Sequence, residues 1–264
     1  MRHFLLSILL FTLLGCSSTS DGRTQVKFLD NEALAQKGAE TFAKMKEQVP
    51  ITQDAQEQAY VQCVADALTQ LVPDSVFSGT WEVVVFDAKD INAFALPGGK
   101  IGIFNGILNV AQTPDQLAAI IGHEIAHVVL DHSNERASQQ MLSKGIGMLG
   151  QFAMDIAGVD RSTQRLALNG YGLLSDLGVL KPFSRLHESE ADEEGLVLLV
   201  QAGYSPYAAV ELWQNMAKAN EGKAPPEFLS THPANETRVK NLQKAIKRVV
   251  KANPKPRKAP KCKR

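Results

Sequence analysis

The chain has 264 residues, of which 44% are hydrophobic, enough to build the core of one ordinary globular domain. Its 28 basic and 28 acidic residues cancel, but they are distributed unevenly. Residues 16–243 hold 17 basic and 28 acidic side chains, a net charge of −11, whereas residues 244–264 hold ten basic side chains and no acid. The hydrophobic content excludes a chain too polar to fold. The charge distribution divides the chain into an acidic body and a basic end.

Residues 1–18 read as a targeting segment. Arg2 precedes an apolar run from Phe4 to Leu14, which is too short to span a bilayer. The run ends in Leu-Leu-Gly-Cys, which resembles a bacterial lipobox. We therefore predict a lipoprotein signal peptide over residues 1–15 and acylation of the Cys16 thiol, which would hold a soluble domain at a membrane surface. A secreted form without lipid is the alternative. The small, polar residues 16–27 are expected to form a tether.

Two amphipathic helices and a small sheet are expected next. Helices are predicted over residues 28–48 and about 54–72, because each apolar pattern ends at a proline, Pro50 or Pro73. Strands are predicted over residues 81–86, 92–96 and 100–104, with a turn at Pro97-Gly98-Gly99.

The stretch from Thr113 to Asp131, TPDQLAAIIGHEIAHVVLD, predicts a buried helix with three polar residues inside it. Thr113 can cap its start, Pro114 suits the first position and Gln116 completes a capping box. His123 and His127 lie one turn apart on the same face, where both imidazoles can reach one zinc ion. Glu124 is placed to act as a base toward a water molecule on that zinc.

A third ligand is needed, and the spacing of acids narrows the choice. Leu130 and Ser133 stand where metzincins carry Gly and His, and no acid occurs from Arg136 to Met154, where thermolysin-like proteins carry Glu. The next candidate is a predicted helix over residues 184–199, SRLHESEADEEGLVLL. Glu188 could complete a two-His, one-Glu site, and Asp192, on the same face, could hold a ligand imidazole or take part in proton transfer.

The segment between these two helices, residues 141–159, is apolar and rich in glycine. It predicts either a close-packed internal helix or a mobile cover over the active-site cleft. After Gly203 a helix is expected from Ser205-Pro206 to about residue 220, and then a last helix. The apolar face of that last helix holds Val239, Leu242, Ile246 and Val249.

The motifs together resemble one family. HEIAH, followed by ESEAD, is similar to the HtpX- and CAAX-prenyl-protease-like zinc metallopeptidases, which are gluzincins. INAFALPGGKIGIFNGIL, residues 91–108, and STHPANETR, residues 230–238, resemble two further segments of that family. With the lipobox, the resemblance is closest to the periplasmic LoiP- and BepA-like lipoproteins. The resemblance covers about residues 28–250, leaving residues 251–264 as a basic tail.

The resemblance implies an α+β fold, mostly helical, with a zincin-like metallopeptidase domain and a small three-stranded sheet. It implies one Zn²⁺ per chain on His123, His127 and Glu188, with Glu124 and Asp192 as catalytic residues. His232 would stabilise the oxyanion or occupy the open zinc position at rest. One sheet edge, at Asn92, Ala93 and Phe94, would bind substrate as an added strand.

The implied function is endoproteolysis of unfolded or misassembled envelope proteins. The implied location is the periplasmic face of the outer membrane, where Cys16 would anchor the chain. There we expect no nucleic-acid partner. A zinc-binding envelope chaperone or assembly factor without proteolysis is the alternative. For the basic tail, anionic lipid headgroups, the acidic body of the protein and solvent remain open as its surroundings.

The three cysteines leave two after acylation of Cys16. In an oxidising compartment, Cys63 and Cys262 are expected to pair. The alternative is a buried, unpaired Cys63 with Cys262 free or bridged to a second chain.

Overall fold

The computed structural model describes residues 16–18, 23–156, 161, 180–219, 228–229, 232 and 236–264. The predicted signal peptide lies outside these residues. The chain forms two compact units, Met1–Asn31 with Asp131–His187, and Glu32–Leu130 with Glu188–Arg264. The second unit contains the sheet and all the predicted metal ligands.

A three-stranded mixed sheet organises the second unit. Its strands are β3 (Glu82–Phe86), β4 (Ala93–Leu96) and β5 (Lys100–Phe104), in the order β3-β5-β4. β3 runs parallel to β5, whereas β4 and β5 form an antiparallel hairpin. Gly98 and Gly99 turn that hairpin with φ of 83° and 68°, backbone angles that glycine adopts without strain. The three predicted strands and the turn are therefore confirmed, and β4 is an edge strand of the described sheet.

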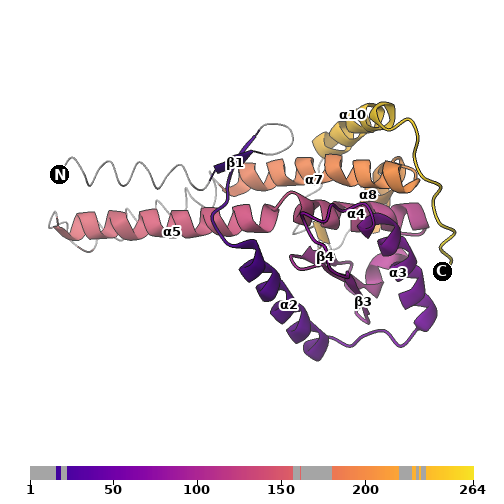
Figure 1. Cartoon of the computed structure of the whole chain (residues 1–264), viewed down its shortest axis with the longest axis horizontal. Helices are drawn as coiled ribbons and strands as arrows, with labels where there is room; N and C mark the ends of the chain where they lie inside the picture. Colours follow the sequence, from indigo (N-terminus) through magenta and orange to yellow (C-terminus); the bar gives the residue numbers. More distant parts are fainter. Residues whose placement is uncertain are drawn as a thin grey trace. The chain divides into compact units, whose positions relative to one another are not determined.

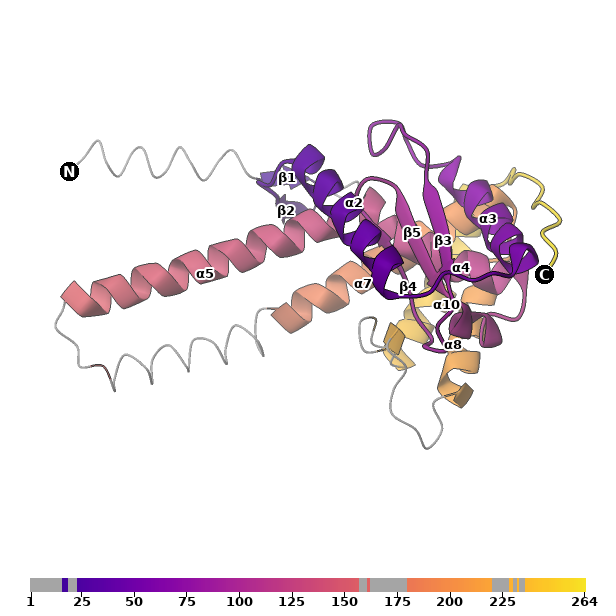
Figure 2. The ribbon, with the colours of Figure 1, turned by 90° about the horizontal axis from the view of Figure 1, so that it is seen from below.

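Helices cover both faces of this sheet. One face is covered by α2 (Asn31–Gln48), as Figure 2 shows. Phe42 of α2 makes edge-on contact with Phe86 and Phe94, with 6.1 Å between ring centroids in each pair. The other face packs against α3 (Ala55–Thr69) and α4 (Pro114–Val129). Because side chains alternate along a strand, Ala93 and Ala95 face α4 while Phe94 joins the aromatic cluster on the opposite face.

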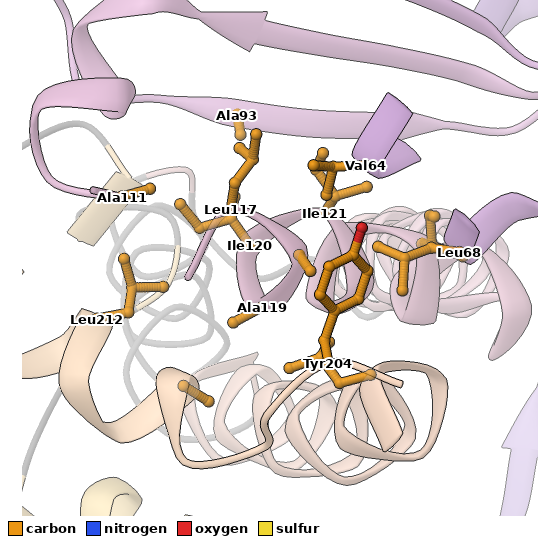
Figure 3. Close-up of a cluster of buried hydrophobic side chains, with 14 of the residues drawn as sticks. Val64, Leu68, Ala93, Ala111, Leu117, Ala119, Ile120, Ile121, Tyr204 and Leu212 are labelled. Carbon is orange, nitrogen blue, oxygen red and sulfur yellow. The ribbon is translucent and has the colours of Figure 1, made fainter. Parts of the chain in front are cut away.

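α4 is the central helix of the core. Leu117, Ile120 and Ile121 are almost fully buried, and Figure 3 shows them meeting Val64 of α3 and Ala93 of β4. The Thr113 side chain accepts a hydrogen bond from the backbone N–H of Gln116, as predicted. The other half of the expected capping box differs, because Gln116 Oε1 accepts from the backbone N–H of Gln112 and not from Thr113.

Further helices complete the second unit. After the 3₁₀ turn η1 (Asn105–Asn109) and α4 come α7 (Leu180–Ala202), α8 (Ala208–Ala219) and α10 (Glu236–Ala252). α10 runs beside α7, where Arg248 pairs with Glu193 at 2.8 Å (Figure 1). Leu242, Ile246 and Val249 of α10 are buried, which confirms that part of its predicted apolar face.

Two glycines let α7 approach α4 closely. A Cβ atom on Gly195 would lie 3.1 Å from the backbone nitrogen of His123 and 3.2 Å from the carbonyl carbon of Gly122. A Cβ on Gly122 would lie 3.3 Å from the backbone oxygen of Gly195. Both contacts are with backbone, which cannot rotate away. The backbones of α7, which carries Glu188 and Asp192, and of α4, which carries His123, therefore approach closely at two positions that have no side chain.

The C-terminal tail is docked and covalently attached. A disulfide joins Cys63 of α3 to Cys262, 199 positions later in the chain. The backbone N–H of Arg257 donates to Gln201 O, and Arg264 Nη1 donates to Leu108 O at 2.7 Å. Of the alternatives considered for these cysteines, the structure contains the intramolecular bridge. The tail is thus attached to the domain, while its basic side chains remain exposed.

The first unit contains a short hairpin and a long helix. β1 (Cys16–Ser18) pairs with β2 (Thr24–Val26), and β2 contacts α5 (His132–Ile156). Arg23 forms two hydrogen bonds with the buried Glu135 carboxylate, which Gln25 also contacts. Residues 23–27, expected in a flexible tether, are thus built into the fold.

The prediction of a close-packed internal helix over residues 141–159 is wrong for its described part. Residues 141–156 continue α5, and Met141 and Ile156 are 54% and 73% exposed. Residues 157–159 lie outside the described residues. None of the helices that the structure describes combines the length and hydropathy needed to cross a bilayer.

We predict that Gly195→Ala lowers the free energy of unfolding by about 1–3 kcal/mol, because the new methyl group must displace the backbone of α4. Thermal unfolding, together with bound metal per chain, measures this effect. Gly145→Ala in α5 is the matched control, since no atom lies within 4 Å of a Cβ placed there. An unchanged midpoint for Gly195→Ala would show that the close contact does not limit the packing.

We predict that Cys262→Ser lowers the free energy of unfolding by up to about 5 kcal/mol, the chain-entropy value for a loop of about 200 residues. Urea denaturation with and without reductant measures it. Reductant should destabilise the wild type to the level of Cys262→Ser and leave the variant unchanged. A wild-type curve that does not respond to complete reduction would contradict this contribution.

Candidate metal centre

Four side chains from three parts of the chain converge in the second unit. α4 contributes His123 and His127, α7 contributes Glu188, and His232 precedes α10. One ligand atom from each lies within 4.8 Å of all the others. Their side chains are 5–12% exposed, so solvent has little access to these polar atoms. Helical spacing of four residues aligns the two histidines of α4, whereas Glu188 and His232 arrive through tertiary packing.

The distances fit a tetrahedral metal ion. His123 Nε2 lies 3.1 Å from His127 Nε2 and 3.3 Å from Glu188 Oε2, and His127 Nε2 lies 3.5 Å from Glu188 Oε1. Bonds of about 2.1 Å in tetrahedral geometry would separate the ligand atoms by about 3.4 Å. The donor set of two imidazoles and one carboxylate is one that zinc takes in catalytic sites. These three residues therefore fit the metal that their motif predicts.

His232 lies where a fourth ligand would stand. Its Nδ1 atom is 3.0 Å from both oxygens of Glu188 and 3.2 Å from His123 Nε2. Its Nε2 atom lies 3.3 Å from Glu124 Oε1. The ring of Phe228 packs against the ring of His232, with centroids 4.7 Å apart. His232 consequently touches both the ligand set and the predicted base.

Glu124 carries an acceptor with no hydrogen bond. Its Oε1 atom is buried and forms no hydrogen bond among the described residues. Burial raises the pKa of Glu124 above the usual range of a glutamic acid, although the charges of His232 and His123 oppose this. A buried carboxylate oxygen of this kind, facing the ligand cluster, is suited to accept a proton from a small molecule bound there.

Asp192 contacts the other nitrogen of a ligand imidazole. Its Oδ1 atom lies 3.2 Å from His123 Nδ1, while His123 Nε2 belongs to the ligand cluster. Burial disfavours charge on His123, but hydrogen bonds to Asp192 and Glu188 outweigh it and raise the pKa of His123 to about 9. Of the two roles considered for Asp192, this geometry matches the one that holds the imidazole. It does not bring Asp192 to the reacting side of the ring.

The three predicted substrate-binding residues lie at the start of β4, with different surroundings. Asn92 O accepts a hydrogen bond from Phe104 N, and Asn92 Oδ1 accepts from Ala93 N. Ala93 is buried against α4, and the Phe94 ring lies among Phe42, Phe86 and Phe104. The side chains of Ala93 and Phe94 are thus engaged in packing, and only the backbone of this edge strand is suited to receive an extended peptide.

Sequence reasoning did not single out Arg238. It lies six residues after His232 within the STHPANETR segment, and it forms ion pairs with both Asp192 and Glu188. A basic residue in a predicted amphipathic helix is ordinarily solvated, so its type alone carried no signal. His132 and His187 stack at 4.3 Å in the first unit and do not join the cluster.

Comparisons with known proteins agree with this site. Residues 55–246 match the model of peptidase family M48. The mitochondrial metalloendopeptidase OMA1 of Schizosaccharomyces pombe is 39% identical over 165 residues, which are 62% of this chain and 46% of that protein. The metalloprotease LoiP of Escherichia coli is 31% identical over 159 residues, 60% of each chain. The beta-barrel assembly-enhancing protease of Escherichia coli is 30% identical over 158 residues, 57% of this chain and 31% of that protein.

The matched part covers less than two thirds of each of these relatives. LoiP and the beta-barrel assembly-enhancing protease are the kind of relative that the motifs predicted, whereas the mitochondrial relatives were not anticipated. The family model spans the sheet, both histidines of α4, the acids of α7 and His232, which are the elements that build the metal centre. The chain belongs to peptidase family M48.

Proposed function

We propose that this chain is a zinc-dependent endopeptidase that degrades unfolded or misassembled proteins of the bacterial cell envelope. One observation carries the enzymatic part of the proposal. The donor atoms of His123, His127 and Glu188 lie 3.1–3.5 Å apart, next to the unbonded oxygen of Glu124. A purely structural zinc site needs no such base, because its function ends with coordination.

His123, His127 and Glu188 would hold one zinc ion. When bound, zinc supplies Lewis-acid chemistry: it polarises a carbonyl oxygen and acidifies water. Glu124 takes a proton from the attacking water and transfers it to the leaving amine, so that one carboxylate acts as base and then as acid. Burial raises the pKa of Glu124, which suits a carboxylate that must accept a proton and later release it.

His232 has two proposed roles that its position supports equally. Its contact with Glu188 is compatible with closing the ligand set at rest. Its contact with Glu124 is compatible with a donor that stabilises the oxyanion during the reaction. Asp192 would act indirectly, by holding the ring of His123 in the orientation that presents Nε2.

The substrate would bind along β4. An extended peptide can add to the edge strand through main-chain hydrogen bonds, which read little of the side-chain sequence. Such a mode favours segments that are already unfolded, because only these can offer a free strand. The proposed preference for unfolded envelope proteins rests on this feature and on the printed names of LoiP and the beta-barrel assembly-enhancing protease.

The lipobox at Cys16 supports attachment to the periplasmic face of the outer membrane by lipid chains. The names of the mitochondrial relatives point to another compartment, but the apolar run followed by Leu-Leu-Gly-Cys is a feature of bacterial lipoproteins. The proposed partners are thus a membrane, bound through the lipid anchor at Cys16, and unfolded envelope proteins.

We predict that Glu124→Gln keeps the fold and the bound zinc but lowers cleavage of casein by about 10²–10⁴-fold, because the base is lost and the ligands remain. Proteolysis of fluorescent casein, with metal content of the same samples, measures both. Chelator should abolish wild-type cleavage and zinc should restore it. Wild-type turnover by Glu124→Gln would contradict the proposed mechanism. A wild type that binds zinc and prevents aggregation without cleavage would favour the chaperone alternative.

We predict that Glu188→Ala lowers bound zinc well below one per chain after dialysis, because one of three ligands is removed. Glu190→Ala on the same helix is the matched control and should keep one zinc, since Glu190 does not belong to the ligand cluster. Metal analysis by mass spectrometry decides between them. Equal zinc content in the two variants would remove Glu188 from the site.

A further inference from the structure

Arg238 has a charged side chain that is almost completely buried. It belongs to α10 and is only 7% exposed. A buried guanidinium is costly unless several partners satisfy its charge and its donors. The identity of those partners therefore indicates why this residue is an arginine.

The guanidinium makes a two-pronged contact with Asp192. Its Nε atom donates to Oδ2 at 2.7 Å and its Nη2 atom donates to Oδ1 at 2.8 Å. This planar pair fixes the carboxylate in rotation as well as in position, which a lysine cannot do. The other face of Arg238 is supported by Trp213 of α8, with the guanidinium carbon 4.2 Å from the ring centroid.

The remaining nitrogen of the guanidinium contacts a proposed metal ligand. Arg238 Nη1 lies 2.9 Å from Glu188 Oε2. Glu188 and Asp192 are one helical turn apart on α7, so one side chain from α10 holds both acids of that face. Burial favours the neutral forms of both acids, but Arg238 and His123 hold the pKa of Asp192 below its usual range. Hydrogen bonds to the imidazoles of His123, His127 and His232 hold the pKa of Glu188 below its usual range in the same way.

Asp192, which Arg238 holds in place, in turn contacts His123. Arg238 Nη2 also lies 3.4 Å from His123 Nδ1, and both atoms are donors when the ring presents Nε2 to the cluster. Asp192 Oδ1 is the acceptor between them, 2.8 Å from Nη2 and 3.2 Å from Nδ1. An anchored Asp192 thus fixes both the rotation and the tautomer of a ligand imidazole.

We propose that Arg238 is a positioning residue that preorganises the metal centre. Through Asp192 it orients His123, and through its direct contact it places Glu188, so two of the three ligands depend on one guanidinium. This inference rests on the proposed metal site. It concerns the affinity and geometry of that site and not the proton transfers of the reaction.

Metal affinity of three arginine variants tests the proposal. Arg238→Met removes the charge and the donors, and it should weaken zinc binding by about 10–100-fold, as expected for a lost partner of metal ligands. Arg238→Lys keeps the charge but loses the two-pronged contact, so its zinc affinity should lie between those of the wild type and Arg238→Met. Competition with a chromophoric chelator measures the dissociation constants.

Arg248→Met is the matched control. Arg248 also joins α10 to α7 through a carboxylate, Glu193, but this pair is exposed and no member of the metal cluster takes part. It should bind zinc within about twofold of the wild type. An equal loss in Arg248→Met and Arg238→Met would assign the effect to helix pairing and overturn the proposal.

A spectroscopic measurement separates positioning from general support of the fold. Cobalt-substituted Arg238→Met should show an altered ligand-field spectrum, while its far-ultraviolet circular dichroism matches the wild type. Asp192→Asn should cause a similar change, and the double variant should lose no more affinity than the worse single variant, because both act in one chain of contacts.

Wild-type affinity and an unchanged cobalt spectrum in Arg238→Met would overturn the inference. If that variant does not fold, the same result in a folded Arg238→Lys would overturn it, since the two-pronged contact is lost there too. A wild type that binds no zinc would instead refute the proposed function, so the two failures are distinguishable.

Discussion

The metal centre depends on the close approach of α4 and α7. His123 and His127 come together through helical periodicity alone, but two imidazoles do not complete a site. Glu188 and Asp192 reach them because Gly122 and Gly195 leave no side chain between the two backbones at the point of contact. A methyl group at Gly195 would lie 3.1 Å from the backbone nitrogen of His123, so the two helices would have to move apart slightly. The close packing of two helices therefore sets the distance between the acids and the histidines.

The close packing of α4 and α7 gathers several ionisable groups in a buried site. Three carboxylates and three imidazoles lie in the site, and burial alone would drive the carboxylates toward their neutral forms. For Glu188 and Asp192, cationic and hydrogen-bonding partners reverse this tendency, whereas for Glu124 burial prevails. The pKa values of these acids are consequently shifted in different directions although all three are buried near His123. Two suit the fixed role of holding and positioning ligands, and one suits the transfer of a proton.

The surrounding elements keep this arrangement rigid. The sheet is packed on both faces, by α2 on one and by α3 and α4 on the other. The C-terminal tail crosses back to α3 and is bonded there through Cys262, with further hydrogen bonds to the end of α7 and to η1. The basic tail is thereby held against the more acidic body of the protein. Rigid support of this kind matches the need of a metal centre for ligands that are in place before the ion arrives.

Local patterns were sufficient for the three-stranded sheet, for α4 and for half of the site. β-branched content predicted β3, and the Pro-Gly-Gly turn marked the hairpin of β4 and β5. The 3.6-residue period predicted α4 with its two histidines. These patterns could be read because they depend on neighbours in the chain. Glu188 was also accessible, through the absence of acids from Arg136 to Met154 and through family resemblance.

Contacts between distant segments could not be obtained in this way. The tertiary structure alone brought His232 Nδ1 to Glu188 across 44 positions, and it placed the ring of Phe94 in an aromatic cluster. It also replaced the expected tether at residues 23–27 by a buried contact with Glu135, and it made Arg238 a partner of two acids on another helix. The physical reason is the same in each case: burial selects the partners of a polar side chain by spatial proximity, which the composition of its own segment does not specify.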